Sequence, residues 1–336
     1  MDGDVEGVEE GLRAIGSSLL PGESVESLRD LVIEGEDGCV SNLPGTFVRA
    51  EHIAGLRVSV HGDESKPALL TFHDIGLNAA STFTAFLQFC SAGVCEELYQ
   101  TCHYHLEAPG HELRAGDIAE EQEWITLDDL AASVAHVVSH YGLKNYFLLG
   151  VGTGANVMFR HALAHAHDVR SIILISPTLQ SAGVTDIMYT RMMVNYWLKG
   201  ITAWPQWAHN YFLARWFSDT FREQRAEQVR LFSQTLDRMS VANVLRLVYA
   251  DAVRTDLLAD ARLVGGALSH TSVLIIVGKE CYTAVEQVDA ARQLLSRQYT
   301  SVVEVPHAGL LVLHEQPAAV ARAVRLFFQG HSIIAQ

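Results

Sequence analysis

Three alternating glycines, at positions 150, 152 and 154, most strongly constrain the fold of this chain. They follow the apolar run 146–149 and precede a segment, 155–165, of helical composition. Strand, sharp turn and helix in this order are typical of a nucleophile elbow, in which a reactive Ser, Cys or Asp lies between two glycines. The outer glycines are needed because the turn leaves no room for their side chains. The central residue, however, is Gly152, which has no side chain to react.

A glycine-rich turn between a strand and a helix also binds phosphate groups or S-adenosylmethionine through its backbone N–H groups. Such sites need an acidic residue about 20 residues further on, at the end of the next strand, to hold a ribose. Here the next predicted strand, 171–175, ends in Ser176-Pro177, and the third glycine of a dinucleotide motif is replaced by Val157. We therefore predict no cofactor.

Charge and cysteine content limit the classes of partner and compartment. The formal net charge of −15 argues against nucleic acid or an anionic membrane surface as a partner. Five cysteines, an odd number without a Cys-x-x-Cys pair, fit a reducing compartment. The chain begins with neither a basic leader nor an apolar run, and it contains no stretch of 18 apolar residues. We expect a cytoplasmic protein that does not span a membrane.

From residue 51 onward, apolar strands alternate with helical segments, which predicts a mostly parallel central sheet covered by helices on both faces. The alternation is interrupted over 178–266 by a segment rich in helix formers and aromatic residues. Together with the elbow, this order predicts an α/β-hydrolase fold, with its core at 51–177 and 267–336 and a helical cap at 178–266.

Residues 1–50 are predicted to form an acidic, partly ordered arm that precedes this core. Within the arm, Val25, Leu28, Leu31 and Val32 recur at helical spacing after the candidate cap residue Ser24. This short helix is expected to dock on the body of the protein.

The catalytic triad expected in such a fold follows the chain order nucleophile, acid, histidine. The acid would lie three residues after Gly278, at Cys281, and the histidine would follow Gly309, at Leu310. With Gly152 at the elbow, all three triad positions are predicted to be vacant.

The predicted oxyanion hole, which would use the backbone N–H groups of Thr153 and a residue near Ile75, is compromised as well. Asp74 follows His73 where active relatives commonly carry His-Gly. A carboxylate about 4 Å from a developing oxyanion opposes it by about 4 kcal/mol at an effective dielectric of 20.

Other side chains near these positions leave a relocated mechanism open. Thr153 and Ser176 carry hydroxyl groups, and Cys281 carries a thiol that a histidine would have to activate. The nearby candidate bases are His73, His307 and His314.

Sixteen histidines raise the question of a metal site. His161 and His165 lie four residues apart on one predicted helical face, as zinc ligands do, but no acidic ligand accompanies them. His103, His105 and His111 lie on and after a predicted strand. We interpret both groups as structural or surface histidines and predict no metal.

The aromatic residues of the cap suggest an interaction surface. Packing of the cap on the sheet would bury most of these rings, and any exposed remainder would form a patch for a protein partner or a membrane surface. The candidate residues for this surface are Trp197, Trp204, Trp207 and Trp216.

Between Glu51 and Gly330 the chain resembles the N-myc downstream-regulated (NDRG) family. The motifs that carry the resemblance are 73–78 (HDIGLN), 107–110 (EAPG), 150–155 (GVGTGA), 277–278 with 284–286, 309–310 with 316–317, and 327–330 (FFQG). The resemblance implies an α/β-hydrolase fold without hydrolase activity and a role in signalling, stress response, differentiation or trafficking through protein partners.

We therefore interpret the chain as a catalytically silent α/β-hydrolase-fold protein that acts as an interaction or adaptor module. Its protein partners are not identified by the sequence, and peripheral membrane association stays open. Two alternatives remain at this point. One is a hydrolase with a relocated nucleophile, and the other is a sensor that binds a small ligand or lipid in the pocket between core and cap, lined by His73, Asp74, Ile75, Thr153 and Ser176.

Overall fold

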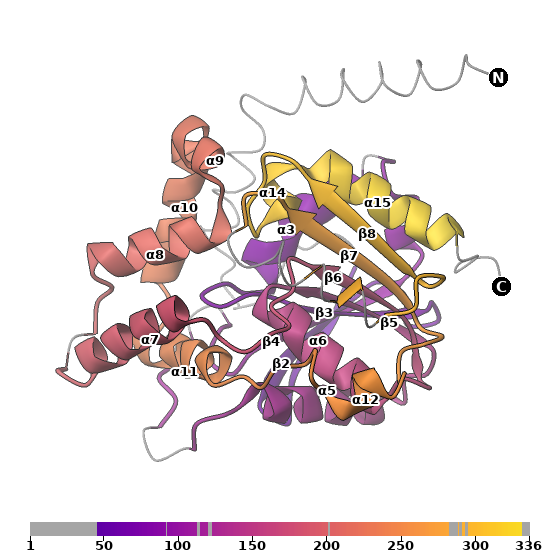
Figure 1. Cartoon of the computed structure of the whole chain (residues 1–336), viewed down its shortest axis with the longest axis horizontal. Helices are drawn as coiled ribbons and strands as arrows, with labels where there is room; N and C mark the ends of the chain where they lie inside the picture. Colours follow the sequence, from indigo (N-terminus) through magenta and orange to yellow (C-terminus); the bar gives the residue numbers. More distant parts are fainter. Residues whose placement is uncertain are drawn as a thin grey trace.

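The computed structural model describes residues 46–330 apart from 92, 113–114, 120–122, 201, 282–287, 289–290 and 293–294. The helix expected at 25–32 and most of the helix expected at 284–296 lie outside these residues. The described part of the chain forms a three-layer structure, with a central sheet between two layers of helices and a helical cap beside it (Figure 1).

An eight-stranded sheet in the order β1-β2-β4-β3-β5-β6-β7-β8 is the centre of the structure. β1 and β2 are antiparallel to their neighbours, and all pairings from β4–β3 to β7–β8 are parallel. The prediction of a mostly parallel sheet is confirmed. The strands are β1 (Phe47–Ile53), β2 (Leu56–His61), β3 (Ala68–Phe72), β4 (Cys102–Glu107), β5 (Tyr146–Val151), β6 (Val169–Ile175), β7 (Ser272–Gly278) and β8 (Thr300–Val305).

Two helical layers cover this sheet. One contains α3 (Ala79–Ser91), α4 (Glu96–Tyr99), α14 (Val312–Glu315) and α15 (Pro317–Gly330), and the other contains α5 (Leu127–Tyr141), α6 (Thr153–Ala164) and α12 (Ala261–Val264) (Figure 1). Because both faces are covered, β3 and β5 are buried along their whole length. Residues 82–98 have a helical composition, but they are divided between two helices, since the chain turns at Gly93, whose φ is +84°, between α3 and α4.

Local sequence signals set the ends of the helices. Thr126 accepts a hydrogen bond from the backbone of Asp129, whose carboxylate accepts one from the backbone of Thr126, so a capping box begins α5. Gly142 ends the same helix in the left-handed conformation. The helix therefore runs along the sheet with both termini satisfied, and it packs against α6.

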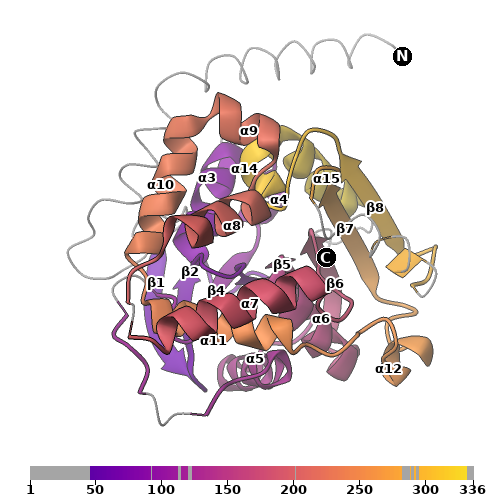
Figure 2. The same ribbon diagram turned by 60° about the vertical axis from the view of Figure 1, so that its left-hand side comes forward.

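Five helices between β6 and β7 form the cap (Figure 2). They are α7 (Val184–Trp197), α8 (Gln206–Trp216), α9 (Asp219–Gln224), α10 (Ala226–Asp237) and α11 (Val241–Ala252). α12 follows them in the chain but lies against α6 of the core. Within the described residues, no helix combines the length and the apolarity that crossing a bilayer requires.

Candidate functional site

The three glycines form the predicted elbow between β5 and α6. Gly152 has φ +55° and ψ −117°, a backbone conformation that side chains rarely adopt outside strained functional turns. A Cβ atom at Gly150 would lie 2.5 Å from Cα of Ala155, and one at Gly154 would lie 2.5 Å from the carbonyl oxygen of Phe72. Both outer positions therefore exclude any side chain, as the motif predicts.

Asp74 occupies the space where the side chain of a nucleophile would begin. A Cβ atom at Gly152 would lie 2.5 Å from Cγ of Asp74 and closer still to its Oδ1. Oδ1 accepts a hydrogen bond of 2.8 Å from the backbone N–H of Thr153, and the backbone N–H of Ile75 also interacts with the carboxylate. The two predicted donors of the oxyanion hole are thus both directed at a carboxylate of the protein itself.

The cap supplies the counter-ion. Arg215, from α8, donates from Nε to Oδ2 of Asp74 and from NH2 to Oδ1, both at 3.0 Å. Both side chains are essentially inaccessible to solvent, at 1% and 0% exposure. Paired N–H···O bonds of this kind fix the planes of the two groups as well as joining their charges. The pair therefore joins the cap to the elbow at the point where a substrate would bind.

A second buried pair extends this network. The hydroxyl of Thr153 donates to Oδ1 of Asp251 at 2.8 Å and accepts from NH2 of Arg215 at 3.2 Å. Arg254 donates to Oδ2 of Asp251 at 2.7 Å. Two carboxylates and two guanidinium groups therefore lie around the N-terminus of α6, with their charges paired. We call the five residues Asp74, Thr153, Arg215, Asp251 and Arg254 the elbow network.

The protonation of Asp74 follows from these contacts. Burial on its own raises the pKa of this carboxyl group, but Arg215 and the N–H groups of Thr153 and Ile75 outweigh burial and hold the pKa below its ordinary value. Asp74 is therefore ionised at neutral pH. An anion already fills the position that stabilises negative charge in an active hydrolase.

The other two positions predicted to be vacant in the triad, 281 and 310, lie in packed parts of the structure. Cys281 and Leu310 are buried, at 4% and 0% exposure. A Cβ atom at Gly278 would lie 2.6 Å from the carbonyl carbon of Ala308, so the segments after β7 and β8 are in backbone contact. The carboxylate of Glu315 accepts hydrogen bonds from the N–H of Gly309 at 2.8 Å and of Ser218 at 3.1 Å, which fixes this contact to the cap.

Each of the three predicted alternative bases contacts another group of the protein. His73 accepts from the backbone of Ala108 through Nε2 and lies 2.8 Å from the carbonyl oxygen of Asp74 through Nδ1, and burial lowers its pKa to about 4. Burial likewise lowers the pKa of His314 to about 4, and its Nε2 lies 3.1 Å from the carbonyl oxygen of Thr82. His307 is exposed and lies 3.3 Å from Glu280.

Neither candidate hydroxyl is hydrogen-bonded to a histidine of the described residues. The hydroxyl of Thr153 donates a hydrogen bond to the carboxylate of Asp251, which is itself paired with Arg254. Ser176 is buried with φ +44°, and its hydroxyl has no hydrogen-bond partner among the described residues. Neither arrangement resembles a nucleophile hydrogen-bonded to an imidazole.

The histidine groups that resemble metal sites are held by other contacts. Nε2 of His161 lies 2.7 Å from the hydroxyl of Tyr146, and the ring of His161 stacks on that of His165. Nδ1 of His105 lies 2.7 Å from the hydroxyl of Thr71, and Nε2 of His103 lies 2.8 Å from the carbonyl oxygen of Leu98. In the part of the chain that the structure describes, no three histidine, cysteine, aspartate or glutamate side chains are placed to share a metal ion.

The tryptophans predicted as an interaction surface are not the exposed residues of the cap. Trp216 is fully buried, and its indole donates to the carbonyl oxygen of Ile75, so its assignment to a surface is wrong. Trp197, Trp204 and Trp207 are half-buried against the core. The aromatic content of the cap serves mainly to pack it, because large rings bury much apolar area.

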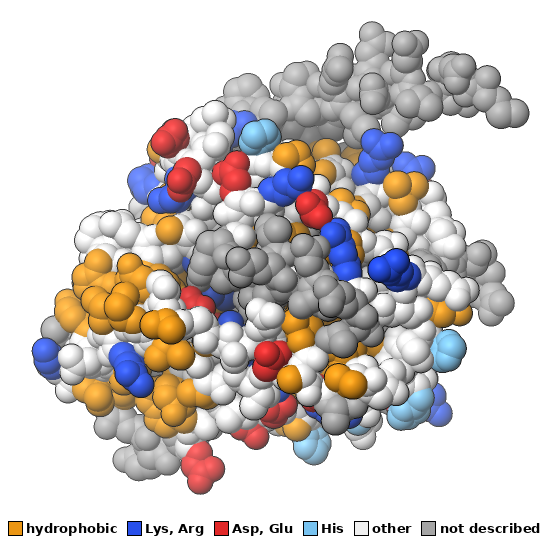
Figure 3. Space-filling model, in the orientation of Figure 1, with side chains coloured by type: hydrophobic (Ala, Val, Ile, Leu, Met, Phe, Trp, Pro, Cys, Tyr) orange, Lys and Arg blue, Asp and Glu red, His pale blue; other side chains and the backbone are white. Residues whose placement is uncertain are grey.

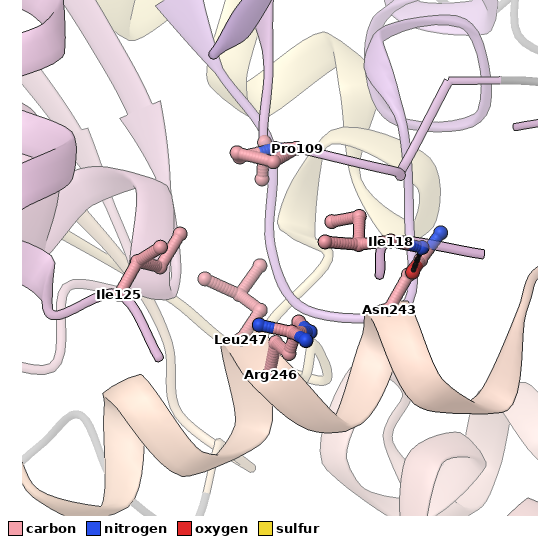
Figure 4. A pocket seen from close by; sticks show the side chains of 7 residues that line it. Pro109, Ile118, Ile125, Asn243, Arg246 and Leu247 are labelled. Carbon is pink, nitrogen blue, oxygen red and sulfur yellow. Dashed lines mark hydrogen bonds between the residues drawn. The ribbon is translucent and has the colours of Figure 1, made fainter. Parts of the chain in front are cut away.

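One small cavity lies under α11 (Figure 4). Its lining residues are Ala108, Pro109, Ile118, Ile125, Asn243, Arg246 and Leu247. Asn243 ties α11 to the segment below it by donating to the carbonyl oxygens of Gly110 and Gly116. The free volume is about 10 Å³, which holds roughly one water molecule. This cavity does not accommodate an organic ligand.

Sequence reasoning placed Asp74 at the oxyanion donors but missed Arg215, Asp251 and Arg254. A signal for Asp251 was present, because the apolar spacing Val244, Val248 continues to position 251 and places a carboxylate on the buried face of α11. A charged residue on the buried face of a helix indicates a buried partner of opposite charge, because an unpaired charge in the interior is costly.

Solved structures with similar backbones include an esterase and an enol-lactonase. An esterase from Thermogutta terrifontis superposes with a TM-score of 0.66 at 16% identity, over 84% of this chain and 99% of the esterase. The enol-lactonase from Burkholderia xenovorans LB400 gives a TM-score of 0.61 at 14% identity, over 84% and 100%. These likenesses establish the α/β-hydrolase fold.

A family model, described as the Ndr family, matches residues 48–335. The chain belongs to the Ndr family. Its relatives include Protein NDL1 of Arabidopsis thaliana, at 29% identity over 82% of this chain and 78% of the relative. Protein NDRG1-A of Xenopus laevis is 26% identical over 90% of this chain and 76% of the relative. The resemblance to this family in the sequence motifs is thereby confirmed.

Proposed function

We propose that this Ndr-family chain is a non-catalytic interaction module that acts in signalling, stress response or trafficking by binding protein partners. The observation that carries the proposal is the Asp74–Arg215 pair, which fills the oxyanion position with a fixed anion. A site that held a substrate would need this space. The surface of the protein is then what remains available for recognition.

Two electrostatic and chemical losses support the absence of triad hydrolysis. The N–H groups of Thr153 and Ile75 already bind Asp74, whose charge Arg215 balances, so these donors are not free to stabilise a second anion. Removal of a triad serine alone lowers turnover on the order of a millionfold. Since both losses affect one catalytic unit, they are not multiplied.

Neither alternative gains support from the site. A relocated nucleophile of the serine–histidine type would need a hydroxyl hydrogen-bonded to an imidazole, and neither Thr153 nor Ser176 forms such a bond with a described residue. A ligand sensor would need an open pocket between core and cap. Among the described residues, the elbow network fills the space beside Gly152, and the cavity under α11 has room for about one water molecule.

The catalytic half of the proposal is tested by mass spectrometry after labelling with a fluorophosphonate and with iodoacetamide, beside a panel of short-chain esters. An active esterase treated in parallel shows that the reagents and the assay work. We expect no selective stoichiometric adduct and no turnover above buffer. A single adduct with turnover, both abolished by substitution of the labelled residue, would refute the proposal.

Whether the function in cells needs a nucleophile is tested in cells that depend on the protein. A variant without two of the three candidate nucleophiles, S176A/C281A, is expected to restore the phenotype as well as the wild-type chain at equal abundance. Failure of a stably folded variant to do so would favour the relocated mechanism.

A further inference from the structure

An apolar surface on the cap has no cover among the described residues. α7 exposes Val184, Met188 and Met192 at spacings of four residues, and Leu198 follows the helix. α11, which packs against α7, exposes Tyr249 and Val253. Figure 3 shows hydrophobic side chains gathered over this part of the cap. We call these six residues the cap face.

The cap face is continuous across its two helices. The ring of Trp124 lies 4.8 Å from the ring of Tyr249 and 6.3 Å from the ring of Trp197, so an aromatic bridge joins α11 to the end of α7. Val184 and Leu198 are 86% and 70% exposed. Contiguous apolar surface of this kind marks a site of contact with another segment or molecule.

Two cations lie beside the cap face. Arg191, on α7, and Lys199, just after it, are exposed. Neither forms an ion pair with another described residue, whereas Arg222 and Arg230 of the same cap do. An apolar stripe with unpaired positive charge at its border suits an amphipathic segment with acidic flanks.

The chain itself contains such a segment. Residues 1–45 hold eleven acidic and two basic residues, a formal charge of −9 out of the total of −15. Within 23–37, Val25, Leu28 and Val32 repeat at helical spacing, and six acidic residues accompany one arginine. Glu26 and Asp30 fall beside the apolar stripe of a helix with this sequence. The apolar stripe of the segment therefore matches the apolar side chains of the cap face, and its acidic residues match the two cations beside that face.

The connection is long enough. The 13 residues between Ile33 and Phe47, where β1 begins, span at most roughly 45 Å. A domain of this size has a radius of gyration of about 20 Å, so the extended connection is comparable in length with the diameter of the molecule, roughly 50 Å. Docking within one chain also costs less entropy than recruitment of a second molecule, because the tether raises the local concentration to the millimolar range.

We infer that residues 23–37 dock on the cap face, with Val25, Leu28 and Val32 against the exposed side chains of α7 and α11 and the acidic flank near Arg191 and Lys199. The inference goes beyond the proposed function by naming a surface and its occupant. It does not depend on whether the elbow can catalyse a reaction.

Photo-crosslinking in the full-length chain tests this inference. Met188 is replaced by p-benzoylphenylalanine, the purified protein is irradiated at micromolar concentration, and the linked peptides are identified by mass spectrometry. A matched control carries the same probe at Leu326, which is 57% exposed on α15, away from the cap. We expect links from position 188 to 23–37 within a band of monomeric mass and no such links from position 326.

Two further variants test the stated contacts in the background of the probe at 188. Leu28→Ser with Val32→Ser removes the apolar stripe, and Arg191→Glu with Lys199→Glu reverses the charge beside the cap face. Each pair is expected to lower the yield of links by about fivefold or more, since exposed ion pairs and partly buried apolar contacts each affect such equilibria severalfold.

Three results would overturn the inference. The first is the absence of links between position 188 and the arm, and the second is an equal yield from positions 188 and 326. The third is a link to 23–37 found only in dimers and rising with protein concentration, which would assign the cap face to a second copy of the chain. These readouts use no substrate and no partner, so they are independent of the labelling and complementation experiments.

Discussion

Asp74 fills the space that a side chain at position 152 would need, and a double-mutant cycle measures the conflict between the two. The single changes are Gly152→Ala, which adds a Cβ atom, and Asp74→Ala, which removes the carboxylate. The Cβ atom that Gly152→Ala introduces would lie 2.5 Å from Cγ of Asp74, far inside van der Waals contact. Asp74 would have to leave its hydrogen bonds to Thr153 and Arg215 to accommodate it.

The expected magnitudes follow from these contacts. Removal of one partner of a buried ion pair costs about 3–5 kcal/mol, which is our expectation for Asp74→Ala. Gly152→Ala carries a backbone strain of about 1–3 kcal/mol at φ +55° and disturbs the same pair. In the double variant the clash is absent, so Gly152→Ala should cost only its strain. The coupling energy is therefore about 3 kcal/mol in favour of the double variant.

Equilibrium unfolding in urea, followed by circular dichroism and fluorescence, gives the four free energies. An added carboxylate provides an internal control, because formate can enter the space that Asp74→Ala leaves beside Arg215. At a concentration ten times its dissociation constant, formate would stabilise this variant by about 1.4 kcal/mol, with no such effect on the wild type. Additive single changes, or a formate effect equal in both proteins, would refute the placement of Asp74 at the elbow.

Three further predictions concern stability and pH. Asn243→Ala is expected to cost about 2–4 kcal/mol in urea unfolding, because Asn243 is fully buried and bonds three backbone groups of 110–118; a cost below about 1 kcal/mol would contradict this bridge. Burial lowers the pKa of His73 and other histidines to about 4, so the unfolded chain binds protons first and stability should fall as the pH drops from about 6.5 to 4. Glu107, whose pKa burial raises to about 7, acts in the opposite direction, so Glu107→Gln should make that fall steeper; an unchanged slope would be the contrary result. Thr126→Ala removes the capping box of α5 and is expected to cost about 1 kcal/mol, read as a lower urea midpoint with the same slope, whereas no shift would show that the cap is dispensable.

Features set by adjacent residues could be predicted from the sequence. Gly150 and Gly154 define the elbow because the residues that exclude their side chains are neighbours in the chain or in the next strand. The parallel order of the sheet follows from the alternation of buried strands with helices. Asp74 could be placed near Thr153 because the carboxyl ends of β3 and β5, adjacent parallel strands, lie at the same edge of the sheet.

Features set by the packing of the cap could not be predicted from the sequence. Arg215 lies 141 positions after Asp74, and no local pattern states how α8 is oriented over the sheet. For the same reason Trp216 was assigned to a surface although it is buried, since the uncharged run before it does not reveal which face meets the core. The exposed side chains of α7 are aliphatic or contain sulfur, so the aromatic pattern of the cap does not reveal this surface.

The carboxylate at position 74 also has an evolutionary consequence. A single codon change that turned Gly152 into serine would place the new side chain against Asp74, so this first step toward an esterase would lose stability without gaining turnover. Loss of Asp74 first would strand the charge of Arg215 in the interior. Either of these two single changes therefore begins with a loss of stability. The buried pair makes the order of the changes matter, because only their combination removes the clash between positions 74 and 152.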